Sequence, residues 1–359
     1  MNKLSSNHFM LLILSVTMIA LRSYSSIFIE LGGRDTWILA LLASVIIGLF
    51  VLFLLKICIS TDTYDIKIIF ESYFTKFISK LFLLIFAIGL FLIALESAAV
   101  NASSIHTNYF ISSPIWYCLL LFLIPSTYVI CRNFNTILIV VITTVCFILL
   151  GDIFYLILVM KYLDLNYLLP ILRNGITSNM WLCLFSLLGS LSSVMIVFPF
   201  LKYWKKDNKL LTDSTMAFII ICFFITTSFV SLISFLGPER ASNIFFPEYI
   251  QSQRVQVADF FEFGEIFYIF RSSLMWFIKY TLCSFGIISL YDNIIKNKKK
   301  FIIPYTLIIF ILATYFTENQ YFLFYNLKLL QIIILIPFVL IPFISFLYYR
   351  IKYSKNSNS

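Results

Sequence analysis

Residues 8–38 read HFMLLILSVTMIALRSYSSIFIELGGRDTWI, and this stretch decides the fold class of the chain. An apolar run begins at Phe9 and is interrupted near its middle by Arg22-Ser23-Tyr24-Ser25-Ser26. Each such polar group at membrane depth costs on the order of 1–3 kcal/mol unless it faces protein or water. We therefore predict a discontinuous first membrane span that turns its polar groups toward a central site, as transporter helices do.

Composition places the chain among integral membrane proteins. Of its 359 residues, 61% are hydrophobic and 12% are charged, and the mean hydropathy is +0.97. Soluble domains contain about 25% charged residues. The apolar runs are long and continuous, which is typical of helical spans and not of the short alternating strands of a β-barrel. No cleavable signal peptide is predicted, so the first run is expected to remain as a permanent span.

We predict an all-α protein of about ten transmembrane helices, because ten apolar runs approach the ~20 residues that a bilayer crossing needs. Their approximate limits are 8–29, 36–56, 80–107, 114–131, 135–160, 180–201, 213–236, 266–293, 301–317 and 323–349. An even number of crossings places both termini on one side of the membrane. The connections on that side hold 17 lysines and arginines against five on the other, which predicts that both termini are cytoplasmic.

The basic runs predict contact with membrane lipid and not with nucleic acid. The net charge is +9, and the basic runs at 202–209 and 296–300 lie at the cytoplasmic ends of predicted spans, where such residues contact membrane lipid. We predict no nucleic-acid partner.

Seven cysteines are scattered singly and there are two histidines, without metal-ligand spacing. We therefore predict no metal, no cofactor and no enzyme activity; function would rest on binding and conformational change.

Two connections are long enough to form structure of their own. Residues 57–79 predict an amphipathic helix on the cytoplasmic face, with apolar residues at helical spacing: Ile66, Ile69, Phe70, Tyr73 and Phe77. Residues 238–265 place Ile250, Val257, Phe260 and Phe261 on one helical face and also carry Glu248, Asp259, Glu262 and Glu265. We interpret this outer connection as a surface helix with an apolar underside; a lid over an outer vestibule is the alternative.

Glu96 is the first of several polar residues at membrane depth. It lies in the middle of the span 80–107, and the polar residues Ser97 and Asn101 follow it. An intramembrane carboxylate is a functional candidate, either as a proton carrier or as the partner of a ligand ammonium. The alternative is an ion pair with Arg22 or Lys279, which would neutralise the charge without a ligand.

Lys279 and Arg22 are the two deepest basic residues that we weigh. Lys279, near Thr281 in the span 266–293, needs a buried partner or a polar cavity, and Asp152 is one such partner. Arg22, with Ser25 and Ser26 beside it, is a candidate for the anionic end of a ligand pocket. The alternative for Arg22 is an ion pair with Glu96 or Glu30.

Small residues line one face of the sixth span. Ser186, Gly189, Ser190 and Ser193 form this stripe. Close helix packing through small side chains is one explanation. An unwound, ligand-contacting segment around Gly189 and Ser190 is the other.

Several motifs in order along the chain resemble those of the spore germination permease family, the B subunits of germinant receptors. Gly33-Arg34-Asp35-Thr36-Trp37-Ile38 resembles the Gly-Arg-Asp-Ala-Trp-Ile signature of that family. Similar features are Leu168-Leu169-Pro170-Ile171-Leu172, Phe198-Pro199-Phe200-Leu201, Phe246-Pro247-Glu248-Tyr249-Ile250 and Phe277-Ile278-Lys279. The family is related to the amino acid–polyamine–organocation transporters. One departure is the break at 22–26, which lacks the glycine and proline usual in the family.

The resemblance implies a transporter-like core of two inverted repeats, spans 1–5 in residues 1–179 and spans 6–10 in residues 180–359. Helices 1 and 6 would be discontinuous, with the ligand between them and the third and eighth helices. The expected partners are an A-type membrane subunit and a C-type lipoprotein in the spore inner membrane. The expected function is sensing of a small-molecule germinant, such as an amino acid.

The residues alone leave a second function open. The same fold would serve a proton-coupled amino acid transporter that uses Glu96 or Asp152, since a fold does not fix a function. The family motifs favour the receptor subunit.

Overall fold

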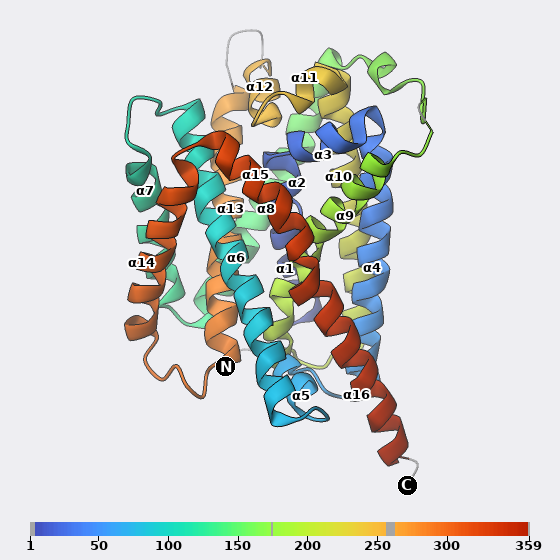
Figure 1. Cartoon of the computed structure of the whole chain (residues 1–359), viewed down its shortest axis with the longest axis vertical. Helices are drawn as coiled ribbons and strands as arrows, with labels where there is room; N and C mark the ends of the chain where they lie inside the picture. The colour runs from blue at the N-terminus through green and yellow to red at the C-terminus, as the bar shows by residue number, and fades with distance from the viewer. Residues whose placement is uncertain (1–3, 174, 256–262, 358–359) are drawn as a thin grey trace.

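The computed structural model describes residues 4–173, 175–255 and 263–357, and it confirms an all-α, transporter-like membrane protein. The long helices run side by side along the longest axis of the molecule, and both termini lie at the same end (Figure 1). A helix is the expected solution for these apolar runs, because a backbone in lipid must satisfy its hydrogen bonds internally.

The first five predicted spans correspond to helices α1 to α8. Their bounds, with the short elements between them, are α1 Ser6–Thr17, α2 Ile19–Ser23, α3 Ser26–Gly32, η1 Gly33–Asp35, α4 Thr36–Ser60, α5 Ile66–Glu71, α6 Lys76–Asn108, α7 Ile115–Ile130, α8 Phe134–Val159, η2 Met160–Tyr162 and η3 Leu165–Leu168.

The second five predicted spans correspond to α9 to α16. Their bounds are α9 Ser178–Leu191, η4 Ser192–Tyr203, α10 Leu210–Leu236, α11 Pro238–Ser242, α12 Pro247–Gln253, α13 Phe263–Leu290, α14 Lys298–Thr317, α15 Gln320–Ile333, the π-helix η5 Ile336–Leu340 and α16 Ile341–Ser357. Among the described residues, nine helical stretches are long and apolar enough to cross a membrane, and α7, with 16 residues, is a shorter tenth.

The first span is interrupted, as predicted, but at two places. Met18 separates α1 from α2, and Tyr24 and Ser25 separate α2 from α3. The α3 helix ends at Gly32, and Gly33 has φ +57°, a value that glycine adopts without strain. The predicted polar segment 22–26 therefore straddles the second interruption.

The sixth span changes helix type near its middle. The α-helix α9 gives way at Ser192 to a 3₁₀ segment of 12 residues, whereas such runs rarely exceed 3–4 residues. Gly189 and Ser190 belong to the last turn of α9, so the change falls after the residues that we expected to unwind. The Ser193 hydroxyl donates to the Val16 carbonyl at 3.1 Å, which ties this change to the end of α1.

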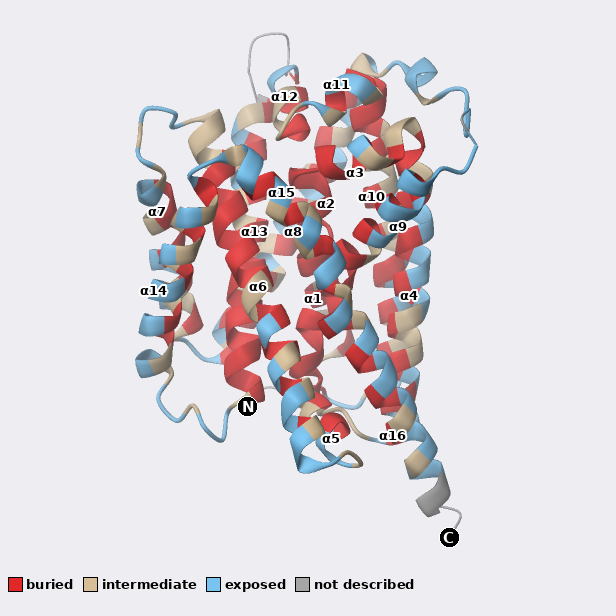
Figure 2. Cartoon of the chain, in the orientation of Figure 1, coloured by how far each residue is buried: buried red, intermediate tan, exposed pale blue. Residues whose placement is uncertain are grey.

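The interrupted helices and α13 lie at the centre of the bundle. Over its most apolar stretch α13 is 83% buried and the first span 78%, against 28% for α14. Figure 2 shows the same contrast, with α1 and α13 largely buried and pale exposed faces on α4, α7 and α14. The polar groups of the central helices are therefore kept away from lipid.

Two of the family-like motifs contact each other at the end of the molecule opposite the termini. The Arg34 guanidinium donates to the carbonyl of Leu169, and the Asp35 carboxylate accepts from the backbone N–H of Leu172 at 3.0 Å. The corner between α3 and α4 is thereby fixed to the connection that leads into the sixth span.

The two long connections differ from their predictions. The segment 57–79 forms only the six-residue α5, whose Phe70 packs on Phe82 and Phe86 of α6, while Phe77 already belongs to α6 and is 77% exposed. In the outer connection Val257, Asp259, Phe260, Phe261 and Glu262 lie outside the described residues. Glu248 does not face solvent as a surface helix requires: it is 2% exposed.

Candidate functional site

Four charged side chains from four helices form a closed group near the break of the first span, which we call the four-charge cluster. Arg22 Nη1 lies 2.6 Å from Asp152 Oδ2, and Arg22 Nη2 lies 3.1 Å from Glu248 Oε1. Arg271 Nη1 lies 3.1 Å from Asp152 Oδ1, and its Nη2 pairs with Glu248 Oε2. Each carboxylate thus bridges both arginines, and α2, α8, α12 and α13 are joined.

The four-charge cluster is buried, and its charged groups pair with one another. The side chains are 1–6% exposed. The cavity beside Arg22, Asp152 and Glu248 measures only ≈10 Å³, about the lower limit for one water molecule. In this conformation the Arg22 guanidinium is paired with two carboxylates of the protein, and there is no room for the carboxylate of a ligand.

A second polar group includes a residue of the break itself, and we call it the Glu96 cluster: Tyr24, Glu96, Lys279 and Gln331. Lys279 Nζ lies 3.2 Å from Glu96 Oε2. The Tyr24 hydroxyl donates to Glu96 Oε1, and Gln331 Nε2 donates to the Tyr24 hydroxyl at 2.9 Å. The cluster joins the break of the first span to α6, α13 and α15.

Aromatic and small residues hold the Glu96 cluster in place. The Trp276 ring stacks on Tyr24 at a centroid distance of 6.3 Å, and Lys279 Nζ lies 5.1 Å from the Trp276 ring centroid. Trp276 Nε1 donates to the Ser23 hydroxyl at 3.1 Å. At Gly189 an added Cβ would overlap the Gln331 carbonyl oxygen, so α9 and α15 are in close contact there. The close packing that we weighed for the small-residue stripe is confirmed at this position.

Three of the weighed ion pairs are wrong and one is confirmed. Arg22 pairs with Asp152 and Glu248, not with Glu96 or Glu30, and Glu30 instead pairs with Lys328 at 2.5 Å. Lys279 pairs with Glu96 and not with Asp152. Arg22 lies near the end of α2 and Tyr24 lies in the break itself, and their side chains enter different clusters.

The remaining predicted site residues are dispersed. Ser26 donates to the Phe245 carbonyl at 3.2 Å, and Ser97 donates to the Ile93 carbonyl of its own helix at 2.7 Å. Asn101 lines a different cavity, between α6, α7 and α13. Buried oxygens without a hydrogen-bond partner in the described structure remain on Ser25, Asn101, Ser190 and Thr281. Of the ten predicted residues, the structure joins Glu96 and Lys279 directly and places Gly189 against Gln331.

A cavity of ≈180 Å³ adjoins the Glu96 cluster between α6, α14 and α15. Glu96 is its one charged lining residue, Asn326 is polar, and the other walls are apolar, among them Leu95, Phe316 and Leu327. This volume holds about six water molecules. It therefore suits a small molecule with a cationic group and an apolar part.

Three residues of the two clusters were not predicted as site residues from the sequence. Arg271 lies two helical turns before Lys279, so the spacing of two basic residues on one face of α13 was a usable signal. Glu248 was noted as part of an acidic connection and of a family-like motif, without a role as an ion-pair partner, and Gln331 had no distinguishing pattern. No group of three His, Cys, Asp or Glu side chains that could hold a metal ion occurs in the described part of the chain.

Comparison with known proteins gives one family match. The model of a family described as spore germination protein matches residues 3–323, which is nearly the whole chain. Comparison with curated proteins gives no match.

Proposed function

We propose a ligand-sensing function from one premise: this multi-pass membrane chain belongs to the family of spore germination proteins. It acts as the membrane subunit of a nutrient germinant receptor in the spore inner membrane. It binds a small molecule, an amino acid or a compound of similar size, within the helical bundle. The observation that carries this proposal is the Glu96 cluster, in which a buried carboxylate joins the broken first span to three other helices and borders a cavity.

Binding works in this proposal by exchange of the partner of Glu96. An ammonium group that enters the adjoining cavity competes with Lys279 for the carboxylate, since both are cations that hydrogen-bond to oxygen. The apolar walls take the side chain of the ligand. Because Tyr24 donates to the same carboxylate, a change at Glu96 reaches the break between α2 and α3 directly.

Signalling follows from the position of that break. A ligand shifts an equilibrium only if it binds one conformation better than the other. Release of Lys279 from Glu96 weakens a contact between α6 and α13, and we propose that the resulting change is passed to an A-type membrane subunit and a C-type lipoprotein. The two inverted repeats, 1–179 and 180–359, are the units that move relative to each other.

The first test removes the charge of Glu96. Glu96→Gln is expected to lower the amount of chain in the membrane, because Lys279 is left buried without a counter-charge at a cost of several kcal/mol. The neutral pair Glu96→Gln/Lys279→Met removes both charges and should restore abundance. With abundance restored, we expect at least a tenfold rise in the amino acid concentration that gives half-maximal germination, measured as loss of spore optical density.

A matched control for this test is the ion pair between Glu30 of α3 and Lys328 of α15. Glu30 and Lys328 form a partly exposed ion pair, so Glu30→Gln/Lys328→Met should leave abundance and response unchanged. A Glu96→Gln/Lys279→Met chain at normal abundance with an unaltered response to every amino acid tested would refute ligand binding at this cluster. Proton-driven amino acid uptake by vesicles that contain this chain alone would favour the transporter.

Orientation is part of the proposal, and cysteine labelling tests it. We expect both termini in the cytoplasm because of the excess of basic residues at that end. In intact cells an impermeant maleimide should therefore label Asn243→Cys in the outer connection and leave Asn208→Cys unlabelled until the membrane is permeabilised. The reverse pattern would invert the topology.

A further inference from the structure

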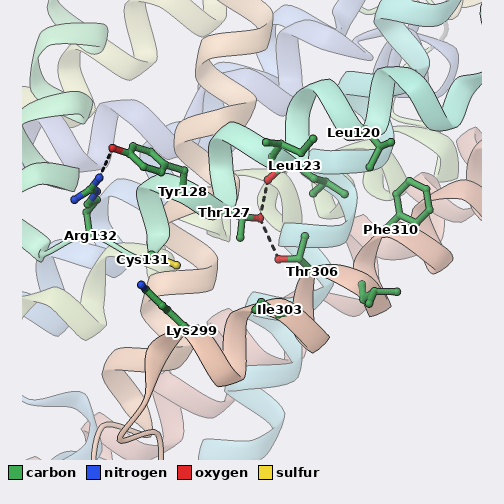
Figure 3. A pocket seen from close by; sticks show the side chains of 12 residues that line it. Leu120, Leu123, Thr127, Tyr128, Cys131, Arg132, Lys299, Ile303, Thr306 and Phe310 are labelled. Carbon is green, nitrogen blue, oxygen red and sulfur yellow. Dashed lines mark hydrogen bonds between the residues drawn. The ribbon is translucent and has the colours of Figure 1, made fainter.

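A groove of ≈760 Å³ lies between α7 and α14, at one edge of the helical bundle (Figure 1), and Figure 3 shows the side chains that line it. Most of its walls are apolar and belong to these two helices: Leu120, Leu123, Ile124, Ile303, Leu307 and Phe310. Ile124 is 65% exposed and Ile303 is 62% exposed, which makes the groove open to the lipid side of the protein.

One end of the groove is cationic. Arg132 follows α7 and Lys299 opens α14, and Figure 3 shows both at the end remote from Phe310. This is the end of the molecule that carries both termini (Figure 1). The Arg132 guanidinium lies 4.4 Å from the centroid of the Tyr128 ring and donates to the Tyr128 hydroxyl. Neither Arg132 nor Lys299 has an acidic partner within ion-pair distance in the described residues.

The floor of the groove offers no unused hydrogen-bonding group at its centre. The Thr127 hydroxyl bonds to the Leu123 carbonyl at 2.7 Å and to the Thr306 hydroxyl at 3.3 Å, as the dashed lines in Figure 3 show. A polar ligand would meet nothing to pair with there. A hydrocarbon chain requires no such partner.

The short length of α7 places the cationic end at the right depth. Its 16 residues span about 24 Å, less than the ~30 Å hydrocarbon core. Arg132 lies two residues beyond the end of α7, and its long side chain can reach from there toward the level of the lipid phosphates. Cytoplasmic leaflets carry anionic lipids that basic residues attract.

We propose that this groove binds one anionic glycerophospholipid. Its phosphate lies between Arg132 and Lys299, and an acyl chain runs along the apolar walls toward Phe310. The site is independent of the Glu96 cluster and of the germinant. Charge complementarity at one end and an apolar path of matching direction favour a lipid over a helix of a partner protein.

Native mass spectrometry of the full chain tests the proposal, with phosphatidylglycerol and phosphatidylcholine as probes. Each basic residue near an anionic surface contributes about fivefold in affinity, so Arg132→Gln/Lys299→Gln should weaken the first phosphatidylglycerol site about 25-fold. Phosphatidylcholine binding should not change. The charge-matched control Lys205→Gln/Lys209→Gln, at exposed lysines outside the groove, should bind phosphatidylglycerol like the native chain.

A second variant fills the groove and leaves its charges intact. Leu307→Trp should weaken binding of the first phosphatidylglycerol at least fivefold. Equal affinity of the native chain for the two lipids, or equal phosphatidylglycerol affinity of the native chain and Arg132→Gln/Lys299→Gln, would overturn the proposal. So would a Leu307→Trp chain that keeps its phosphatidylglycerol affinity but no longer co-purifies with another membrane subunit, since the groove would then hold a protein helix.

Discussion

Asp152→Ala should remove most of the folded chain from the membrane. The substitution leaves Arg22 and Arg271 buried with Glu248 as their one carboxylate, so the four-charge cluster changes from neutral to a net positive charge. Removal of one partner from a buried ion pair costs about 3–5 kcal/mol, a large share of the roughly 5–15 kcal/mol that stabilises a typical folded domain. Immunoblotting of membranes and thermal unfolding of the purified chain measure the effect.

Two further variants make this result specific to charge balance. Arg22→Gln/Asp152→Asn keeps Arg271 with Glu248 as a neutral pair and should recover a substantial part of the abundance. Asp292→Ala removes the partner of Lys202 from a pair whose carboxylate is 52% exposed, and it should change stability by no more than about 1 kcal/mol. An Asp152→Ala chain as abundant as the native one would show that the cluster contributes nothing to folding.

Gly189→Ala is expected to disrupt the contact between α9 and α15. The new Cβ would overlap the Gln331 carbonyl oxygen, which is main chain and cannot move aside as a side chain does. One of the two helices must therefore shift, and the Gln331 side chain, which donates to Tyr24, shifts with it. We expect a loss of about 3 kcal/mol or more in stability, above the usual 1–3 kcal/mol of an overpacked core, together with an impaired germination response.

The glycine at 286 provides the control for this substitution. It also lies in a membrane helix, α13, but a Cβ there meets the flexible Leu90 side chain at 3.3 Å. Gly286→Ala should be tolerated, because alanine is favoured over glycine in a helix by about 1 kcal/mol. If both variants were equally stable, the close approach of α9 and α15 would be unimportant.

The sequence was sufficient for the class of fold and the positions of the spans. Long apolar runs leave few alternatives in lipid, and ten of them stand out in this chain. The interruption of the first span was also predictable, since Arg22 and the hydroxyl residues after it cannot face lipid. The other interruption, at Met18, was not predictable, because an apolar residue gives no signal of a broken hydrogen-bond ladder.

Pairing of the charges was the part that could not be predicted. Arg22 is 130 residues from Asp152 and 226 from Glu248, and no local pattern links positions so far apart. Glu248 was assigned to solvent as one of the acidic residues of a predicted surface helix, whereas tertiary contacts bury it beside Arg271. The pair Glu96 with Lys279 was among the weighed alternatives, since both lie in the middle of their spans.

The wide separation of the four-charge cluster along the chain has a consequence for biosynthesis. Arg22 is translated first and enters the membrane before any of its partners exists, at an insertion cost of about 2.5–3.5 kcal/mol. Asp152, Glu248 and Arg271 then follow in that order, so the summed charge of the group passes through +1, 0, −1 and 0. The four-charge cluster becomes neutral only when the eighth span, which carries Arg271, has been translated. A ribosome that stops before Arg271 therefore leaves a nascent chain with one unmatched carboxylate in this group.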